Sequence, residues 1–241
     1  FYYGNDDTPC KHPLHEAGVY YIQEPSAMAP VSYLMEDYDV VQKEAADCQE
    51  RILDLCAAPG GKSTQIAARM HEMYTSGKWK EQGLLICNEI HPARAKILSE
   101  NVERMGIANA MVTNETPQRL AEMFEDYFTR ILVDAPCSGE GMFRKNEAAC
   151  EEWNPENVSL CAERQDGILD CAASMLAPGG RIVYSTCTFA PAENEGSMTR
   201  FLLRHPEFHI VEVKKAEGMS AGVPEWAYFG EEKGQVLPEI A

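Results

Sequence analysis

The fold of this chain is decided by residues 51–62, which read RILDLCAAPGGK. Residues 51–55 are a short apolar run, typical of a buried strand, and a Pro-Gly-Gly turn follows them. From Lys62 to about Tyr74 the apolar residues recur at helical spacing. A strand, a glycine turn and a helix in this order predict the first unit of an α/β fold.

The alternation of strands and helices continues downstream. We expect strands over residues 83–88, 110–113, 129–134, 180–185 and 208–213, and helices over residues 91–105, 117–127, 155–176 and 192–204. Repeated strand–helix units imply right-handed crossovers, and therefore a Rossmann-like, mostly parallel sheet with helices on both faces. Ligands bind such sheets beyond the carboxyl ends of the strands.

The chain divides into three predicted parts. Residues 1–50 carry four prolines, do not follow the alternation and predict a partly extended lead-in with a helix over 25–35. Residues 51–215 form the α/β domain, and residues 216–241 read as a loop-like tail. The chain does not begin with Met, and we expect it to be a piece of a longer protein.

The composition is that of a globular protein, with 45% hydrophobic and 24% charged residues. No run of 18 apolar residues occurs, so no membrane span is expected, and the first residues do not resemble a signal peptide. The nine cysteines are scattered without a C-x-x-C pair, which indicates a reducing compartment instead of a disulfide framework. Cys10, His12 and His15 fit no common zinc spacing, so no metal site is expected.

The net charge of −17, from 21 basic and 38 acidic residues, argues against a nucleic-acid partner. Phosphate groups are attracted by positive surface, and an acidic field repels them at long range. A nucleic-acid function therefore requires a local basic cleft, or basic charge carried by flanking domains.

The glycine turn is followed by Lys62, Ser63 and Thr64, as in a phosphate-binding loop. Such a loop needs glycine at the position of Cys56, and Pro59 removes a backbone amide that would line the phosphate site. A turn that lets the backbone approach an adenosyl cofactor fits the sequence better. A glycine turn without a ligand stays open as the alternative.

Two acidic residues end predicted strands. Glu89 lies 28 residues after Gly61, where an acidic side chain accepts hydrogen bonds from both ribose hydroxyls, although a solvated acid is the plainer interpretation. Asp134 ends the most apolar strand, where a desolvated charge needs a partner and therefore indicates function.

Two cysteines follow strand ends in separate motifs, DAPCSG at 134–139 and STCT at 185–188. Taken alone, Cys187 is explained equally well as a small buried hydrophobic side chain. Their common place at strand exits favours covalent chemistry by a thiolate.

The three motifs in this order resemble the RNA 5-methylcytosine methyltransferases, the NOL1/NOP2/Sun family, over about residues 15–208. Further matching stretches are YIQEPSAM at 21–28, ERQ at 163–165, APGG at 177–180 and AENE at 192–195. The run GEGMFRK at 139–145 is most similar to the bacterial type F enzymes of 16S ribosomal RNA.

The resemblance implies a class I methyltransferase that binds S-adenosyl-L-methionine and modifies carbon 5 of a cytosine in RNA. The cofactor residues would be Cys56, Ala57, Ala58, Pro59, Gly60, Gly61, Lys62, Glu89, Asn114 and Asp134. Cys187 would be the nucleophile, Cys137 would assist release, and Asp134 would lie between cofactor and base. Relatives often carry Asp near position 114 for the adenine, so Asn114 or Glu115 would take that contact here.

The resemblance also implies the partners: 16S ribosomal RNA or the small ribosomal subunit, bound by a monomer and away from any membrane. A tRNA or DNA cytosine-5 methyltransferase stays an alternative, and in the DNA enzymes the nucleophile would be the Cys137 counterpart, which leaves the STCT motif unexplained. A non-catalytic adenosyl- or RNA-binding module in ribosome assembly is the alternative from another class.

Overall fold

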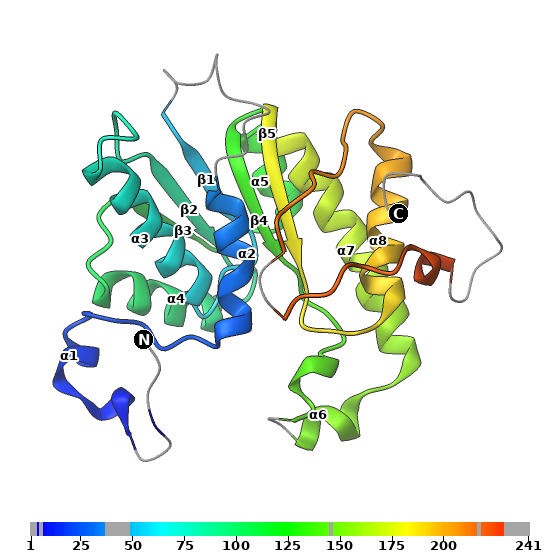
Figure 1. The fold of residues 1–241 in the computed structure, drawn as a ribbon, viewed down its shortest axis with the longest axis horizontal. Coiled ribbons are helices and arrows are strands. Elements are labelled where there is room, and N and C mark those ends of the chain that lie inside the picture. The colour runs from blue at the N-terminus through cyan, green and yellow to red at the C-terminus, as the bar shows by residue number, and fades with distance from the viewer. Residues whose placement is uncertain (1–3, 5–6, 37–48, 145–146, 216–217, 229–241) are drawn as a thin grey trace. The chain divides into compact units, whose positions relative to one another are not determined.

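The computed structural model describes residues 4, 7–36, 49–144, 147–215 and 218–228, and Figure 1 draws its helices and strands. Along the chain the elements are η1 (Pro9–Lys11), α1 (Pro13–Glu16), α2 (Pro25–Met35), β1 (Arg51–Asp54), α3 (Gly61–Thr75), β2 (Leu84–Asn88), α4 (Pro92–Arg104), β3 (Ala110–Thr113), α5 (Pro117–Met123), β4 (Phe128–Asp134), η3 (Glu140–Met142), α6 (Glu147–Glu152), α7 (Pro155–Met175), β5 (Leu176–Ser185), η4 (Pro191–Glu193), α8 (Glu195–Arg204) and η5 (Pro224–Tyr228).

The chain folds as two compact units. The first comprises residues 1–134 and 174–184, and the second comprises residues 135–173 and 185–241. The first unit contains the strands up to β4 and nearly all of β5. Each unit is described separately below.

The sheet has five strands in the order β3-β2-β1-β4-β5. The pairs β1–β2, β1–β4 and β2–β3 are parallel, with Ile52 opposite Leu85 and Arg130 on its two sides. The chain fills one side of β1 with β2 and β3 and then the other side with β4, so the order reverses between β1 and β4. The predicted Rossmann-like architecture is confirmed, and the reversal marks the place where α/β sheets bind ligands.

Both faces of the sheet are buried at β1, because adjacent strand residues that point to opposite faces are both buried. Ile52 and Leu53 of β1 are each fully buried. On one face Ile52 belongs to a core with Leu34 of α2, Ile66 of α3 and Leu98 of α4, and Figure 1 shows these three helices together on one side of the strands. Burial on both faces explains the nearly continuous apolar runs in the sequence.

A buried side chain ties the ends of three strands together. The Asn88 Nδ2 atom, at the end of β2, donates to the carbonyl oxygens of Leu55 (3.2 Å) and Glu115 (3.0 Å). Its Oδ1 atom accepts from the Thr113 hydroxyl at 2.9 Å and from the Glu115 N–H at 3.1 Å. The carboxyl ends of β1, β2 and β3 are therefore aligned by one amide group.

Three predicted elements differ clearly from the structure. The helix that begins at Pro117 ends at Met123, before Asp126, whose φ of 49° no helix tolerates. Strand β5 begins at Leu176 instead of residue 180, because Asp126 and Tyr127 already donate backbone hydrogen bonds to residues 174 and 175. The predicted strand over 208–213 is wrong: this segment forms no strand, and Ile210 within it is largely exposed, so little burial supports pairing there.

In the part of the chain that the structure describes, no helix has the length and apolar character needed to cross a membrane.

Candidate functional site

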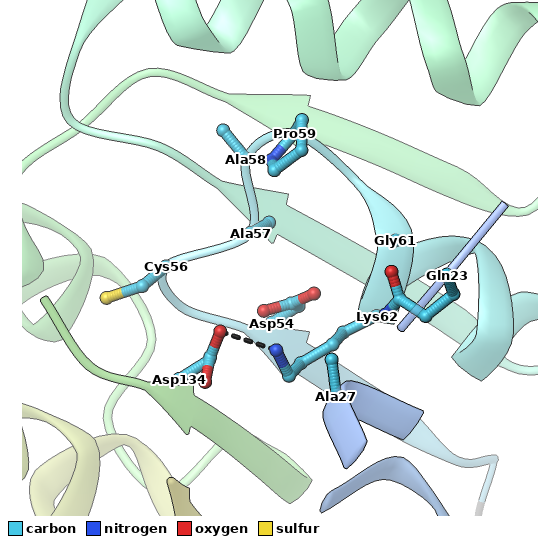
Figure 2. Close-up of a pocket in the computed structure, with 10 residues that line it drawn as sticks. All are labelled: Gln23, Ala27, Asp54, Cys56, Ala57, Ala58, Pro59, Gly61, Lys62 and Asp134. Carbon is cyan, nitrogen blue, oxygen red and sulfur yellow. Dashed lines mark hydrogen bonds and ion pairs between the residues drawn. The ribbon is translucent and has the colours of Figure 1, made fainter. Parts of the chain in front are cut away.

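A pocket opens in the first unit at the carboxyl ends of β1 and β4, on both sides of the point where the strand order reverses (Figure 2). It holds about 320 Å³ of space, part of it open to solvent. Its lining residues are Gln23, Ala27, Asp54, Cys56, Ala57, Ala58, Pro59, Gly61, Lys62 and Asp134. The glycine turn and Asp134, which the sequence predicted to share a site, therefore line the same pocket.

Asp54 ends β1 and is the most deeply buried acid of the pocket. Ser63 donates a hydrogen bond of 2.6 Å to its Oδ2 atom, whereas Oδ1 is buried and has no hydrogen-bond partner among the described residues. Burial raises the pKa of Asp54 to about 7, opposed by the Ser63 hydrogen bond and reinforced by the Asp134 charge. An unsatisfied buried oxygen costs free energy, so a ligand that offers an N–H or O–H group here would be stabilised.

Lys62, in the first turn of α3, forms an ion pair with Asp134 at the end of β4. Their Nζ and Oδ2 atoms lie 2.6 Å apart, and the Lys62 side chain is largely buried. Figure 2 shows the two side chains meeting beside Asp54. The ion pair fixes the position of the Asp134 carboxylate at the pocket although the two residues are 72 apart in sequence.

The two glycines of the turn differ in what they require. Gly60 has φ 112°, a left-handed conformation that strains any side chain. At Gly61 the end of the flexible Gln23 side chain lies directly against the backbone, and a Cβ atom there would displace that amide. Asn101 of α4 donates a hydrogen bond of 2.8 Å to the Pro59 carbonyl and holds the turn in place.

Glu89 follows β2, and its carboxylate faces the start of α4. The Oε1 atom accepts from the His91 N–H at 2.9 Å, and Oε2 lies 3.3 Å from an Arg94 nitrogen. Arg94 also donates to the Ala58 carbonyl at 2.9 Å. Glu89 is buried and is linked to the glycine turn through Arg94, but it does not line the pocket in the part of the chain described here.

Neither residue proposed for the adenine contact lines the pocket, as far as the described residues show. Asn114 donates both amide hydrogens to backbone carbonyls, those of Glu89 (2.6 Å) and Ile90 (3.0 Å). Glu115 forms an ion pair with Arg119 at 3.2 Å. The Asn114 side chain ties the end of β3 to the residues after β2 and keeps only its carbonyl oxygen for a ligand, whereas the Glu115 side chain contacts α5.

Cys56 lines the pocket as a neutral thiol. Burial raises its pKa far above the usual value, and the charges of Asp54, Glu89 and Asp134 add to this effect. A thiol that holds its proton so tightly is a poor nucleophile. Cys56 therefore contributes shape and an S–H group to the pocket.

The second unit brings the two motif cysteines together. The Sγ atoms of Cys137 and Cys187 lie 3.3 Å apart, although the residues are 50 apart in sequence. Cys187 is exposed and Cys137 is partly buried. The hydrogen bond with Cys187, together with burial, raises the pKa of Cys137, so this thiol keeps its proton and Cys187 is the sulfur that a ligand reaches.

A fully buried carboxylate holds the backbone around Cys137. The Glu193 Oε2 atom accepts from the Ser138 N–H at 3.1 Å and from the Gln165 side-chain amide at 2.7 Å. Gln165 also donates to the Pro136 carbonyl at 3.0 Å. The residues on both sides of Cys137 are thus anchored through one buried acid.

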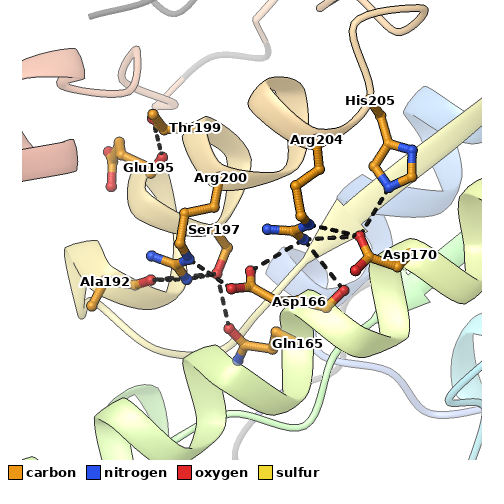
Figure 3. A network of polar contacts seen from close by, with 10 residues as sticks. All are labelled: Gln165, Asp166, Asp170, Ala192, Glu195, Ser197, Thr199, Arg200, Arg204 and His205. Atoms are coloured by element: carbon orange, nitrogen blue, oxygen red, sulfur yellow. Dashed lines mark hydrogen bonds and ion pairs between the residues drawn. The ribbon is translucent and has the colours of Figure 1, made fainter. Parts of the chain in front are cut away.

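Helices α7 and α8 are joined by polar contacts that support this anchor (Figure 3). Arg200 of α8 forms an ion pair of 2.7 Å with Asp166 of α7. The Ser197 hydroxyl donates to the Gln165 Oε1 atom at 3.4 Å. Gln165 therefore points toward Glu193 from a helix that is itself fixed.

The loop that carries Cys187 is held by the segment 139–142. Gly141 donates its N–H to the Cys187 carbonyl at 2.6 Å, and a Cβ at Gly141 would overlap that oxygen. The Glu140 carboxylate accepts from the Phe189 N–H at 2.9 Å. The approach of two backbones explains why glycine is needed at position 141.

The sequence alone predicts no role for several residues that shape these sites. Asp54 lies at the end of a predicted strand, and Gln165 and Glu193 lie in stretches that match the family. The signal for each is burial of a charged or polar group, and burial depends on contacts between distant residues. An acid inside the strongly apolar run 52–55 is the only local hint.

The chain is similar to known RNA methyltransferases. A family model described as 16S rRNA methyltransferase RsmB/F matches residues 43–239. The ribosomal RNA small subunit methyltransferase F of Serratia proteamaculans is 41% identical over 181 residues, which cover 75% of this chain and 34% of the relative. The namesake from Cronobacter sakazakii is 38% identical over 208 residues, 86% of this chain and 39% of the relative. The chain thus spans little more than a third of these relatives.

A solved structure supports the same comparison. The structure titled NSun6 from Pyrococcus horikoshii with SFG is 27% identical, with a TM-score of 0.64, and the match covers 82% of this chain and 45% of that chain.

Proposed function

Since the chain belongs to the 16S rRNA methyltransferase RsmB/F family, we infer that it methylates carbon 5 of a cytosine in RNA with S-adenosyl-L-methionine as the donor. The names of the relatives favour 16S ribosomal RNA of the small subunit as the substrate. The observation that carries the inference is the meeting of Cys137 and Cys187, from two separate motifs, at 3.3 Å. A buried structural cysteine has no need of an exposed partner.

The first unit offers a pocket that suits the cofactor. Its acidic side chains, Asp54 and Asp134, attract a ligand that carries an ammonium group and a sulfonium centre. The unpartnered Asp54 oxygen lacks a donor that such a ligand supplies, and the backbone at Gly61 allows close approach. S-adenosyl-L-methionine supplies an electrophilic methyl group when bound.

We assign the cofactor contacts to the turn 56–62, with Asp134 at the junction between cofactor and base. Glu89 is assigned to the ribose and Asn114 to the adenine, although both now bond to protein groups. The Asn114 carbonyl oxygen and the Glu89 carboxylate oxygens are the acceptors assigned to the ligand.

The thiols divide the covalent chemistry between them. The Cys187 thiolate adds to carbon 6 of cytosine, which makes carbon 5 nucleophilic. After carbon 5 is methylated it loses its proton to a base, and the electron pair returns to break the bond between sulfur and carbon 6. The exposure of Cys187 supports its role as nucleophile, and the distance of 3.3 Å between the two sulfur atoms supports the assignment of Cys137 to assist release.

We assign residues 51–215 to the methyltransferase domain, residues 1–50 to the remainder of an RNA-binding part, and residues 216–241 to a tail that leads to a further segment. Because the relatives are much longer than this chain, basic surface in their other parts would offset the charge of −17. We place the enzyme in the cytoplasm, as a monomer.

The test is detection of a covalent RNA–protein adduct on a denaturing gel. The full-length protein is incubated with 16S RNA and S-adenosyl-L-methionine as wild type, Cys137→Ala and Cys187→Ala. Cys161→Ala, a partly buried cysteine on α7, is the matched control. We expect Cys137→Ala to accumulate the adduct and Cys187→Ala to form none.

The opposite pattern would reverse the two roles and favour the chemistry of the DNA cytosine methyltransferases. Loss of methyl transfer in every protein, wild type included, would favour a non-catalytic binding module or another RNA.

A further inference from the structure

Phe189 is the most exposed large apolar side chain of the described residues, at 75%. Single exposed apolar residues are common on protein surfaces, so exposure alone indicates nothing. What distinguishes Phe189 is its place, two residues after Cys187 in the same loop.

Phe189 and Cys187 are the exposed side chains of residues 187–190. Cys187 is exposed, Thr188 is buried, Phe189 is exposed and Ala190 is buried. Consecutive Cα atoms are about 3.8 Å apart, so the Cα atoms of residues 187 and 189 lie within about 8 Å of each other. The phenyl ring and the thiol therefore emerge close together from the exposed part of the loop.

The backbone under the ring is fixed on several sides. The Phe189 N–H donates to Glu140 at 2.9 Å, and the Asn194 amide donates to the Thr188 carbonyl at 3.1 Å. The Thr188 hydroxyl accepts from the Ala190 N–H at 3.2 Å. A ring held in this way gives up little conformational entropy when it binds, which favours binding.

The surroundings of the ring suit an uncharged, flat group. Met142 and Phe143, 41% and 36% exposed, lie in or next to the segment whose Gly141 bonds to the Cys187 carbonyl. The Phe189 N–H bonds to the carboxylate of Glu140, and a carboxylate repels phosphate. The face of a nucleobase binds to such a surface by stacking, without any positive charge.

We propose that Phe189 stacks on an unpaired nucleobase that flanks the target cytosine. The inference rests on the proposed function of Cys187 as the nucleophile. A thiolate attacks the face of the target ring, so Cys187 lies against that ring when it reacts, and an exposed side chain two residues further along the same loop is placed to contact a neighbouring nucleotide. Stacking there compensates for the neighbour contacts that are lost when the target base leaves its stack.

The test couples a protein change to an RNA change. The full-length wild type first methylates protein-free 16S RNA, and the modified cytosine is mapped. Synthetic RNA fragments around that cytosine are then made with an abasic residue at the 5′ or the 3′ neighbour. Dissociation constants and kcat/KM are measured for wild type, Phe189→Ala, Phe189→Leu and Phe189→Tyr.

Leu203→Ala is the matched control, because Leu203 is also exposed (59%) but lies in the last turn of α8. We expect Phe189→Ala to weaken binding of the intact RNA by roughly 5- to 150-fold, the range measured for loss of one stacked base. Phe189→Leu should bind nearly as weakly, Phe189→Tyr as well as wild type, and Leu203→Ala unchanged. One abasic neighbour should weaken wild type by a similar factor and Phe189→Ala by little more.

If wild type methylates the RNA but an abasic residue on either side weakens wild type and Phe189→Ala equally, the stacking inference is overturned and the proposed function stands. If Phe189→Ala binds as well as wild type, the inference is likewise overturned. If wild type methylates no 16S RNA, the proposed function fails and this inference fails with it.

Discussion

The pocket between β1 and β4 and the thiol pair at 137 and 187 are built in opposite ways. In the pocket, the charged side chains of Asp54, Lys62 and Asp134 stand on regular elements, and Asp54 keeps an oxygen without a hydrogen-bond partner among the described residues. Around the thiols, functional side chains stand on irregular loops, while the carboxylate that supports them, Glu193, has at least two donors. The pocket therefore keeps an acceptor for a ligand, whereas the backbone at the thiols is held by a carboxylate whose donors come from the protein.

The pocket and the thiol site should therefore depend on different sources of stability, a bound ligand in one and a buried carboxylate in the other. Occupation of the pocket should stabilise the protein because it relieves buried charge, while the thiol site should depend on its supporting carboxylate. Substitutions at Glu193, Asp54 and Arg204 test this contrast, in decreasing order of the expected effect on stability.

Glu193→Ala should give the largest loss of stability. It leaves the Ser138 N–H and the Gln165 amide buried without their acceptor, at a cost of about 3–5 kcal/mol in the free energy of unfolding. Urea unfolding measures this loss, and the rate of thiol labelling at Cys137 should rise in native conditions. Glu193→Gln keeps one acceptor oxygen, so its free energy of unfolding should fall by less. A loss below about 0.5 kcal/mol in Glu193→Ala would mean that the carboxylate does not support the loop.

Asp54→Asn should change the pH dependence of stability. Because burial raises the pKa of Asp54 from 3.8 to about 7, the folded state binds a proton that the unfolded state has released between these values. The contribution of Asp54 to stability is thus complete below about pH 4 and is lost as the pH rises through 7, by about 2 kcal/mol between pH 5 and 7. Urea unfolding across this range should show the decline in wild type and a flatter profile in Asp54→Asn.

Glu122→Gln changes an exposed carboxylate on α5 and should keep the wild-type profile. A wild-type profile in Asp54→Asn as well would contradict the assignment of the decline to Asp54.

Arg204→Ala should give the smallest effect. Arg204 pairs with Asp170 at 2.9 Å, but their side chains are 35% and 42% exposed, so solvent screens the pair and the expected loss is about 0.5 kcal/mol. Arg200 is more buried and also donates to the Ala192 carbonyl at 3.1 Å. Arg200→Ala should therefore lower the free energy of unfolding by about 1–2 kcal/mol. Melting temperatures at low and high salt check both values. Equal losses of stability in the two variants would show that the burial of an ion pair does not determine its contribution.

The sequence predicted the parts of the fold that local pattern controls. The helix over 25–35 and the strand over 110–113 have the predicted bounds, because prolines and apolar periodicity mark them. The predicted strand over 208–213 was wrong. Its apolar residues are compatible with a strand, but the segment pairs with no strand among the described residues. A pattern predicts that a segment can pair, and only the tertiary fold supplies the neighbour.

The candidate site was predicted as a set of residues but not as a set of contacts. The glycine-turn motif identified Lys62, and strand-end positions identified Asp134, Cys137 and Cys187. The Lys62–Asp134 and Cys137–Cys187 pairs span 72 and 50 residues, and sequence spacing does not determine these pairs. Glu89 and Asn114 illustrate the reverse. Each lies at the predicted strand end, but its side chain bonds to protein backbone, a choice that depends on the exact path of the neighbouring turn.

The amide of Asn88 has a consequence for how the sheet selects its alignment. It makes four hydrogen bonds to the ends of β1 and β3 and the residues that follow them, and all four are possible in only one register. A slip of one residue would leave the amide buried without partners, in addition to turning apolar side chains to the wrong face. Asn88 therefore penalises misaligned sheets during folding, so the strand ends that form the pocket reach one arrangement before any ligand arrives.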